Sequence, residues 1–206
     1  MNYKEFSLAS LAEESRRLAA LVPETHRPDA IVFIARGGLV IGQAMAEVFQ
    51  CPLCAVKAVR EGSRWKEAVT PVLRLVPRSM RIWMREREVR SGIHAAHTAR
   101  DVRFLTPVPD VNRILLVDDS VDTGTSMQQV CAALQAHCPA AIVEIAAINV
   151  FAKSEALIHT DYAIYRDTLV STPASADNCE HEAFLRRWEA YEMTIAPARG
   201  GAGVPL

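Results

Sequence analysis

The sequence predicts an α/β fold, a twisted and mostly parallel sheet flanked by helices. Continuous apolar and β-branched runs, such as 30–34 and 114–117, are typical of strands that are buried on both faces. Segments with helical spacing of apolar residues alternate with these runs along the chain. Alternation of strands and helices indicates right-handed crossovers, and therefore a parallel sheet.

Each element follows from its pattern and its punctuation. Residues 6–21 place apolar side chains at i, i+3 and i+4, and Pro23 ends that helix. Cys51 and Cys54 have redox or zinc spacing, but we interpret them as small core residues at the entry to a strand. The predicted elements are, in chain order, a helix at 6–21, a strand at 30–34, a helix at 39–49, strands at 52–59 and 114–117, a helix at 126–137, strands at 142–151 and 162–165, and a helix at 180–191.

Two segments depart from this alternation. Residues 60–109 are rich in arginine, contain several prolines and show no long period, which indicates a long inserted loop or hairpin. The chain from 171 onward carries the last helix and a glycine-rich tail at 197–206. We therefore expect a core at 1–170, which includes the N-terminal helix and a flexible insertion at 60–109, and a small C-terminal hood with its tail at 171–206.

Composition limits the class of protein. The 206 residues carry a formal net charge of -1, and half of them are hydrophobic, as in ordinary globular domains. No apolar stretch approaches the roughly 20 residues that a membrane span needs, and the five cysteines fit reduced thiols better than a disulfide framework. We expect a soluble cytoplasmic protein with no membrane or nucleic acid partner. The arginine-rich segment 74–103 is the one candidate for an RNA-binding patch, and that alternative stays open.

The segment RILLVDDSVDTGTS, residues 113–126, carries the clearest chemistry. Asp118 and Asp119 end a buried strand and therefore point to the crevice at the carboxyl edge of a parallel sheet. Residues 122–126 then stand where a helix begins, so that backbone N–H groups and hydroxyls favour a phosphate. Carboxylates would oppose that phosphate unless they face hydroxyl groups or a metal ion. A sugar phosphate supplies both parts.

Two familiar nucleotide motifs are missing. The segment has no Gly-x-x-x-x-Gly-Lys-Ser/Thr, and residues 36–42 lack Gly-x-Gly-x-x-Gly. The segment instead resembles the phosphoribosyl-pyrophosphate (PRPP) motif of the type I phosphoribosyltransferases, which has four hydrophobic residues, two acidic residues and a threonine- and glycine-containing loop. Residues 31–42 resemble the first strand and pyrophosphate loop of that family, and the resemblance covers roughly residues 29–161.

The resemblance implies a role for each matching residue. Asp118 and Asp119 accept hydrogen bonds from the ribose hydroxyls, directly or through water bound to Mg²⁺. Arg36 and Gly37 line the pyrophosphate, and Arg36 stabilises it as it departs. An arginine of the insertion closes over the site. The 5-phosphate is held by Asp122, Thr123, Gly124, Thr125 and Ser126.

Within this family the chain looks most like the xanthine-guanine and hypoxanthine enzymes. By that similarity Lys153 donates to the 6-oxo group of a purine, and Asp122 acts near N7 as general acid or base. The enzymes with which we compare it place an aromatic residue after Asp-Thr in the hood, whereas this chain has Leu169, so that the base loses an aromatic partner.

These observations lead to one expected function and its alternatives. The protein is expected to transfer the 5-phosphoribosyl group from PRPP to a nucleobase nitrogen, with Mg²⁺ as cofactor and pyrophosphate as product, and to form a homo-oligomer as the family does. A 6-oxopurine is the first acceptor and another nitrogen acceptor is the second. A non-catalytic regulator that senses PRPP or a nucleotide on the same fold stays open.

Overall fold

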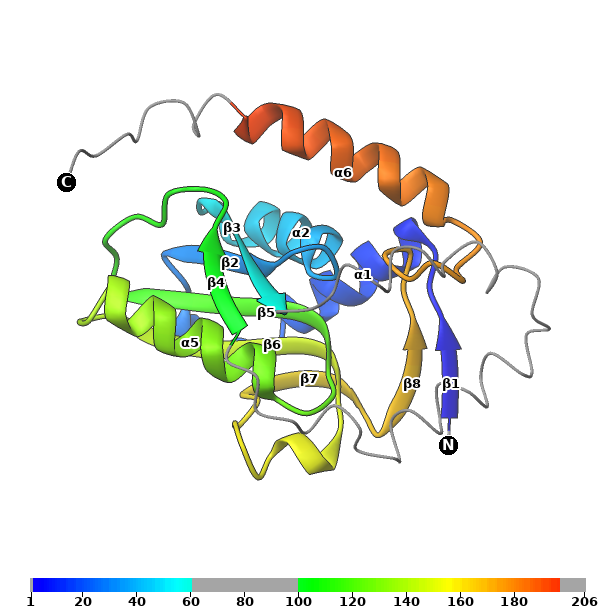
Figure 1. Cartoon of the computed structure of the whole chain (residues 1–206). Helices are drawn as coiled ribbons and strands as arrows, with labels where there is room; N and C mark the ends of the chain where they lie inside the picture. Colours follow the sequence, from blue (N-terminus) through cyan, green and yellow to red (C-terminus); the bar gives the residue numbers. More distant parts are fainter. Residues whose placement is uncertain (1, 61–99, 197–206) are drawn as a thin grey trace.

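A computed structural model describes residues 2–60 and 100–196 of the chain (Figure 1). Its main sheet has six strands in the order β4-β3-β2-β5-β6-β7. Only β3 and β4 pair in the antiparallel direction, and the other four pairings are parallel. The strands of this sheet are β2 (Ala30–Ile34), β3 (Leu53–Arg60), β4 (Arg100–Phe104), β5 (Arg113–Val121), β6 (Ile142–Val150) and β7 (Tyr162–Arg166). The predicted α/β fold with a mostly parallel sheet is confirmed.

Helices cover both faces of this sheet. The α-helices are α1 (Leu8–Ala19), α2 (Leu39–Phe49), α5 (Thr125–His137) and α6 (His181–Ile195), and two 3-10 helices, η1 (Glu24–His26) and η3 (Ala152–Ser154), lie in the connections. In β2, Ile31 and Phe33 pack with α1, α2 and α6, whereas Val32 and Ile34 pack on the opposite face with α5. Figure 1 shows the same division, with α5 below the sheet and the other three α-helices above it. Burial on both faces explains why the strands read as continuous apolar runs.

Several boundaries differ from those expected. The first helix is shorter than 6–21 because Ser7 caps it, with a side chain that accepts from the backbone N–H of Ser10. β5 continues past the apolar run through Asp118 and Asp119 to Val121, so the acidic pair belongs to the strand itself. The last helix extends to Ile195.

The segment predicted as an insertion contains a strand at its end. β4 has the sequence RDVRF, with three charged and two apolar residues, and pairs with β3 in the antiparallel direction. Sequence reasoning missed it because five residues give too short a period beside the arginine-rich stretch. The closing arginine was expected within residues 60–103, and 61–99 of this range lie outside the described part of the chain.

A second sheet of two strands joins the two ends of the chain. β1 (Asn2–Glu5) pairs in parallel with β8 (Thr168–Ser171), beside the main sheet (Figure 1). The buried amide of Asn178 donates to the backbone carbonyls of Phe6, at 3.0 Å, and Ser171, at 3.2 Å. The hood therefore includes the N-terminal strand as well as the C-terminal segment. Neither strand was predicted, because each has four residues and β1 is mostly polar.

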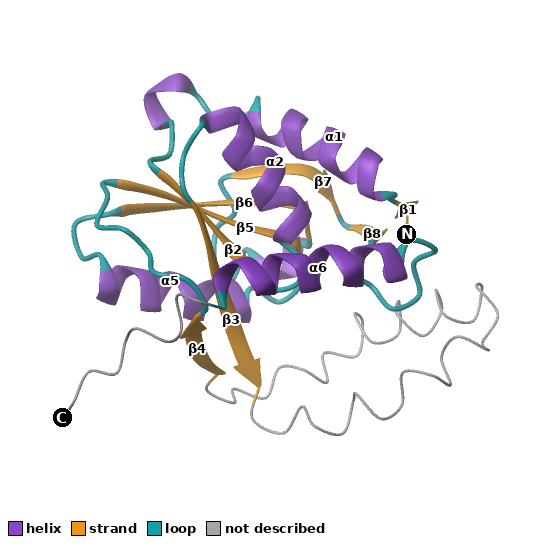
Figure 2. Cartoon of the chain, turned by 90° about the horizontal axis from the view of Figure 1, so that it is seen from above, coloured by secondary structure: helices purple, strands orange, loops and turns teal. Residues whose placement is uncertain are grey.

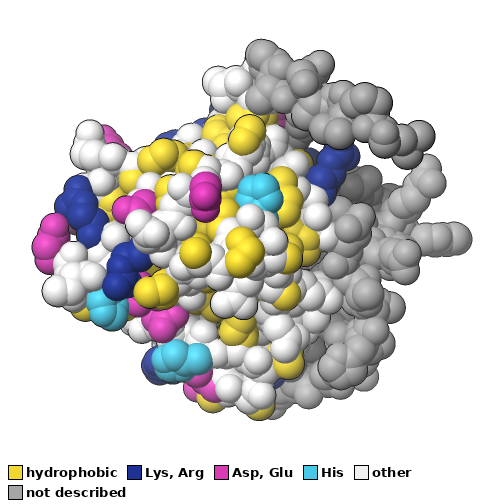
Figure 3. Space-filling model, turned by 90° about the vertical axis from the view of Figure 1, so that its left-hand side faces the viewer, with side chains coloured by type: hydrophobic (Ala, Val, Ile, Leu, Met, Phe, Trp, Pro, Cys, Tyr) yellow, Lys and Arg dark blue, Asp and Glu magenta, His cyan; other side chains and the backbone are white. Residues whose placement is uncertain are grey.

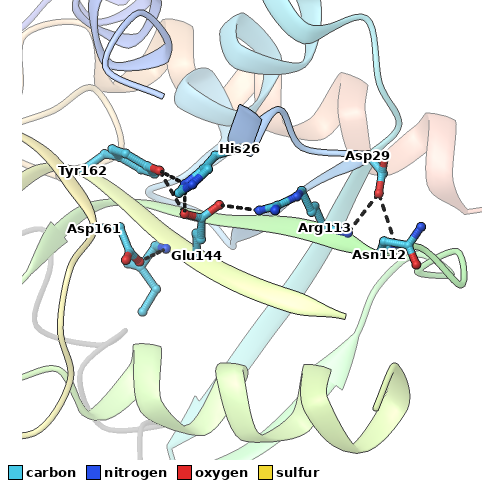
Figure 4. Close-up of polar contacts among 8 residues, drawn as sticks. His26, Asp29, Asn112, Arg113, Glu144, Asp161 and Tyr162 are labelled. Atoms are coloured by element: carbon cyan, nitrogen blue, oxygen red, sulfur yellow. Dashed lines mark hydrogen bonds and ion pairs between the residues drawn. The ribbon is translucent and has the colours of Figure 1, made fainter. Parts of the chain in front are cut away.

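A polar cluster lies at the amino ends of the parallel strands of the main sheet (Figure 4). The carboxylate of Glu144 accepts from the hydroxyl of Tyr162 at 2.9 Å, lies 2.8 Å from Nδ1 of His26 and pairs with Arg113 at 3.7 Å. Asp29 accepts from the backbone N–H of Arg113 at 2.9 Å. Burial, followed by the bond to Glu144, raises the pKa of Tyr162 to about 12. These contacts tie the entry to β2 against β5, β6 and β7.

The surface is mixed in polarity. Figure 3, which views the left-hand side of Figure 1, shows hydrophobic side chains scattered among charged ones and histidines. Large hydrophobic side chains are exposed at Leu21, Val48, Ile142 and Met193. No helix in the described ranges 2–60 and 100–196 is long and apolar enough to cross a membrane.

Candidate active site

The carboxyl ends of β2 and β5 meet at one pocket. Four buried residues of β5, from Ile114 to Val117, precede Asp118 and Asp119, which are partly exposed there. The pocket has a volume of about 480 Å³, within the usual size of small-molecule sites. It is lined by Ile34, Ala35, Arg36, Gly37, Ala58, Asp118, Asp119, Ser126, Ala174 and Ser175.

The turn after β2 approaches the acidic pair very closely. The peptide bond between Ala35 and Arg36 is cis. A Cβ atom at Gly37 would lie 2.7 Å from Oδ1 of Asp119 and 2.8 Å from Oδ1 of Asp118. A side chain at this position would displace the carboxylates, so the close approach of turn and acidic pair requires glycine.

The loop at residues 122–126 leads from β5 into α5. Gly124 is the N-cap residue with a φ of 80°, a left-handed conformation that favours glycine. The hydroxyls of Thr123 and Thr125 are 3.1 Å apart, and Ser126 in the first helical turn lines the pocket. The helix thus begins beside the acidic pair, with its N-terminal N–H groups available for an anion.

Electrostatics at the acidic pair are unfavourable to two full charges. Burial raises the pKa of Asp118 well above its usual value, and the charges of Asp119 and Asp122 raise it further. The backbone N–H of Asp119 donates to Oδ1 of Asp118 at 2.9 Å and offsets part of this rise. A ligand that donates hydrogen bonds, or a cation, relieves this conflict.

Asp122 is held by a chain of polar contacts that the sequence did not reveal. The hydroxyl of Ser120 donates to Oδ1 of Asp122 at 2.8 Å, and the amide of Asn149 donates to Ser120 at 3.4 Å. Asn149 is fully buried, and its carbonyl oxygen accepts from the backbone N–H of Thr168 at 3.1 Å. The only signal for Asn149 in the sequence is a polar residue near the end of the apolar strand β6.

The two residues predicted to bind the nucleobase lie apart from the pocket. Lys153 is exposed in η3, with Nζ 5.8 Å from the centre of the Phe151 ring. Leu169 is buried in β8, where it pairs with Tyr3. Neither residue lines the pocket around Asp118 and Asp119.

The C-terminal segment contributes residues that sequence reasoning missed. Thr172 is fully buried and donates from its hydroxyl to Oδ2 of Asp119 at 2.7 Å. Trp188 of α6 is buried, and the Arg36 guanidinium carbon lies 5.8 Å from the centre of its ring. Figure 2, seen from above, shows α6 on the side of the molecule that carries α2, and Arg187 donates to Gln43 there at 2.7 Å. No short-range pattern links these residues to a motif 50 or more positions away.

The donor set for a metal ion is small. Within residues 2–60 and 100–196, no group of three or more His, Cys, Asp or Glu side chains is placed to hold a metal ion. The acidic pair offers carboxylate oxygens, the ligands that Mg²⁺ prefers, and a bound substrate would have to supply further oxygens.

Fold and site together define a class of protein. A parallel α/β sheet here carries, at one carboxyl edge, a pair of carboxylates, a glycine turn and a helix N-terminus. This is the arrangement of proteins that bind a phosphorylated and hydroxylated ligand at the end of an α/β sheet.

Comparison with known proteins identifies the family. The phosphoribosyl transferase domain matches residues 7–181, which is most of the 206 residues. The chain therefore belongs to the phosphoribosyl transferase domain family, and its fold is that of the type I phosphoribosyltransferases. No curated protein sequence matches the chain significantly.

Solved structures agree on the fold. The chain is similar to a purine phosphoribosyltransferase from Pyrococcus horikoshii, with 16% identity and a TM-score of 0.56 over 84% of this chain and 93% of that one. It is similar to a Helicobacter pylori xanthine-guanine-hypoxanthine phosphoribosyltransferase, with 15% identity and a TM-score of 0.58 over 92% and 99%. A hypothetical protein from Neisseria gonorrhoeae with bound ppGpp shares 16% identity and a TM-score of 0.55 over 93% and 99%. At these identities the likeness concerns the fold.

Proposed function

We propose that the protein transfers the 5-phosphoribosyl group from PRPP to a nitrogen of a nucleobase, a 6-oxopurine, and releases pyrophosphate. The observation that carries this proposal is the convergence of Asp118 and Asp119, the Gly37 turn and the first turn of α5 on one pocket. Membership in the phosphoribosyl transferase domain family supports it.

PRPP would be divided among three groups of residues, two in the pocket and one at the start of α5. Asp118 and Asp119 would accept hydrogen bonds from the ribose hydroxyls. Arg36 and Gly37 would face the pyrophosphate, where the exposed guanidinium stabilises the departing anion. The 5-phosphate would bind at the start of α5, to Asp122, Thr123, Gly124, Thr125 and Ser126. Of these five residues Ser126 lines the pocket, and the other four precede it in the chain without lining the pocket.

Magnesium fits the acidic pair. Oδ1 of Asp118 and Oδ1 of Asp119 both come within 3 Å of the Cβ position of Gly37, so that the two oxygens converge on one region. Two carboxylates with substrate phosphates form the kind of site that Mg²⁺ usually occupies. When bound, the ion would neutralise charge on the leaving pyrophosphate, and Asp118 and Asp119 would hold it through water.

The acceptor half rests on residues that lie farther away. We propose Asp122 as the general acid or base near the purine N7, because Ser120 holds its carboxylate in place. Lys153 would donate to the 6-oxo group, and Leu169 would cover a face of the base in place of an aromatic residue. The names of the Pyrococcus and Helicobacter structures, which specify purines, support this acceptor class.

One assay tests the whole reaction. The protein is incubated with PRPP, Mg²⁺ and each of a panel of purines, pyrimidines and other nitrogen acceptors, and pyrophosphate and nucleotide are measured. The proposal predicts pyrophosphate release that depends on a 6-oxopurine. Turnover with a different acceptor alone would move the substrate class, and saturable PRPP binding without any turnover would refute the enzyme.

Lys153→Ala tests the acceptor assignment separately. Because Lys153 would polarise the 6-oxo group, the variant should lower kcat/KM for 6-oxopurines by roughly tenfold, the size of one hydrogen bond to a charged group. PRPP binding should stay unchanged. Lys57→Ala is a matched control, since Lys57 is also exposed but lies on β3. Equal activity of Lys153→Ala and wild type with every 6-oxopurine would remove Lys153 from the acceptor site.

A second function has one observation in its favour. A structure similar to this chain in fold, the Neisseria gonorrhoeae hypothetical protein, was solved with bound ppGpp. A non-catalytic regulator would use the same pocket to sense PRPP or a nucleotide. Binding without turnover in the assay above is the result that this second function predicts.

Two further expectations go with the proposed function. We propose that the protein acts in the cytoplasm and as a homo-oligomer, as its family resemblance implies. Size-exclusion chromatography with light scattering measures the oligomeric state directly.

A further inference from the structure

We propose that Thr172 is a positioning residue for PRPP binding, which acts by holding the carboxylate of Asp119. The inference rests on the proposed function, because it concerns how the same pocket recognises the ribose. Thr172 comes from the hood, directly after β8, whereas Asp119 follows the buried run of β5. This side-chain contact connects the hood with the pocket around Asp119.

The two oxygens of Asp119 face different surroundings. Oδ2 accepts the hydrogen bond from the Thr172 hydroxyl at 2.7 Å, a short distance typical of a hydroxyl that donates to a carboxylate. Oδ1 lies 2.7 Å from the Cβ position of Gly37, on the side of the turn that lines the pocket. The bond to Oδ2 therefore sets the direction in which Oδ1 points.

The bond from Thr172 acts on a carboxylate that is also repelled by its neighbour. Asp119 is only partly exposed, and its neighbour Asp118 carries a carboxylate that repels it. Thr172 has no exposed surface, so its hydroxyl is fixed by the surrounding hood and delivers the bond in one geometry. A carboxylate held in this way is preorganised for the ribose hydroxyls and loses less freedom when they bind.

A general structural role is carried by other residues of the hood. Asn178 joins the two ends of the chain through the carbonyls of Phe6 and Ser171. The backbone carbonyl of Thr172 accepts from Ser175 at 2.8 Å, and a change of side chain at 172 preserves that bond. The hydroxyl itself is directed to Asp119, so its removal should affect the ligand more than the fold.

The test compares two substitutions with a matched control. Thr172→Val keeps the shape of the side chain and removes the donor, whereas Thr172→Ser keeps the donor. Thr160→Val is the control, because Thr160 is equally buried and its hydroxyl has no hydrogen-bond partner among the described residues. The dissociation constants for PRPP and for inorganic pyrophosphate are measured by calorimetry, and the melting temperature of each variant is recorded.

The expected result is selective. Thr172→Val should raise the dissociation constant of PRPP by roughly tenfold, the effect of one hydrogen bond to a charged group. Pyrophosphate lacks the ribose, so its affinity should stay within twofold of wild type, about the scatter of a neutral substitution. Thr172→Ser and Thr160→Val should bind PRPP as wild type does.

Two other results would overturn the inference, and they differ from failure of the proposed function. Equal PRPP affinity of Thr172→Val and wild type would show that the bond does not position Asp119. Equal loss of PRPP and pyrophosphate affinity, with a lower melting temperature, would show a structural role. If wild-type protein bound no PRPP, the proposed function would fail and this inference with it.

Discussion

At the scale of single residues, the ionised acidic pair of β5 lowers the stability of the unliganded protein. Burial and the neighbouring Asp119 and Asp122 raise the pKa of Asp118 well above 3.8. A group whose pKa is higher in the folded protein contributes stability below its unfolded pKa and loses it as the pH rises through the folded pKa. At neutral pH, an ionised Asp118 therefore destabilises the folded protein. A bound cation or hydrogen-bond donor would offset this destabilisation.

This sign gives a pH-dependent prediction. Asp118→Asn removes the charge but keeps an oxygen to accept from the backbone N–H of Asp119. The variant should unfold at a higher urea concentration than wild type at pH 7, and the difference should shrink as the pH falls toward 4. Urea unfolding across this pH range measures the effect. A wild-type protein that is more stable than the variant at pH 7 would contradict the account.

Substitution of Gly37, compared with substitution of Gly42, tests the geometry of the pocket without changing its charge. Gly37→Ala places a Cβ 2.7 Å from Oδ1 of Asp119, so the carboxylates must move and PRPP affinity should fall by more than tenfold, a loss above 1.4 kcal/mol. Gly42→Ala meets core atoms instead, Cδ1 of Leu53 at 2.9 Å and Cβ of Phe33 at 3.1 Å. It should lower stability by about 1–3 kcal/mol, as overpacking does, and spare PRPP binding. Calorimetry and urea unfolding separate the two effects, and equal behaviour of the two variants would argue against a pocket at Gly37.

Residues of the site could be predicted from the sequence only where they are contiguous. Asp118, Asp119 and the loop after them share one local pattern, a buried strand, two acids and a helix start. Thr172, Asn149 and Trp188 reach the site from distant segments. The pairing of β5 with β6 places Asn149 opposite Ser120, whereas Thr172 and Trp188 reach the site from the C-terminal segment.

At the scale of elements, periodicity predicted the long segments and failed for the short ones. β2, α2 and β6 lie within one residue of their expected bounds, because apolar residues make up all of β2 and most of α2 and β6. β1, β4 and β8 have only four or five residues each, too few for a period to stand out. Their stability comes from pairing with other segments, and a local pattern does not contain that information.

The hood gives a prediction at this scale. Phe6 directly follows β1, is buried, and stacks obliquely with Tyr165 of β7 at 6.1 Å between ring centres. Phe6→Ala should lower the free energy of unfolding by about 3–5 kcal/mol, the usual cost of removing a buried phenylalanine ring. Met193→Ala is the control: Met193 is 73% exposed, and the change should stay within about 0.5 kcal/mol. Urea unfolding measures both changes. A change in the free energy of unfolding for Phe6→Ala that is as small as that for Met193→Ala would show that β1 is not part of the folded hood.

At the scale of the whole molecule, the two ends of the chain close one side of the donor site. The core sheet places the acidic pair, the glycine turn and the start of α5 at a single edge. The hood, built from β1, β8 and α6, supplies Thr172 beside Asp119 and Trp188 beside Arg36. The predicted boundary at residue 170 therefore separates segments that touch the same pocket, and the N-terminal strand assigned to the core pairs with the hood.

The family assignment and the acceptor rest on different foundations. The donor motif could be read from residues 113–126 because its chemistry is local. The acceptor depends on side chains such as Lys153 and Leu169, which do not line the described pocket. An arginine of residues 60–103 was expected to close the site, and 61–99 of this range are outside the described part of the chain.

Titration calorimetry with PRPP tests the central claim, that Asp118 and Asp119 bind the ribose of PRPP. Wild-type protein should bind PRPP saturably in the presence of Mg²⁺. The double variant Asp118→Asn with Asp119→Asn should lose at least a hundredfold in affinity, about 2.7 kcal/mol, while its far-ultraviolet circular dichroism stays unchanged. Unaltered PRPP affinity in a folded double variant would contradict the account.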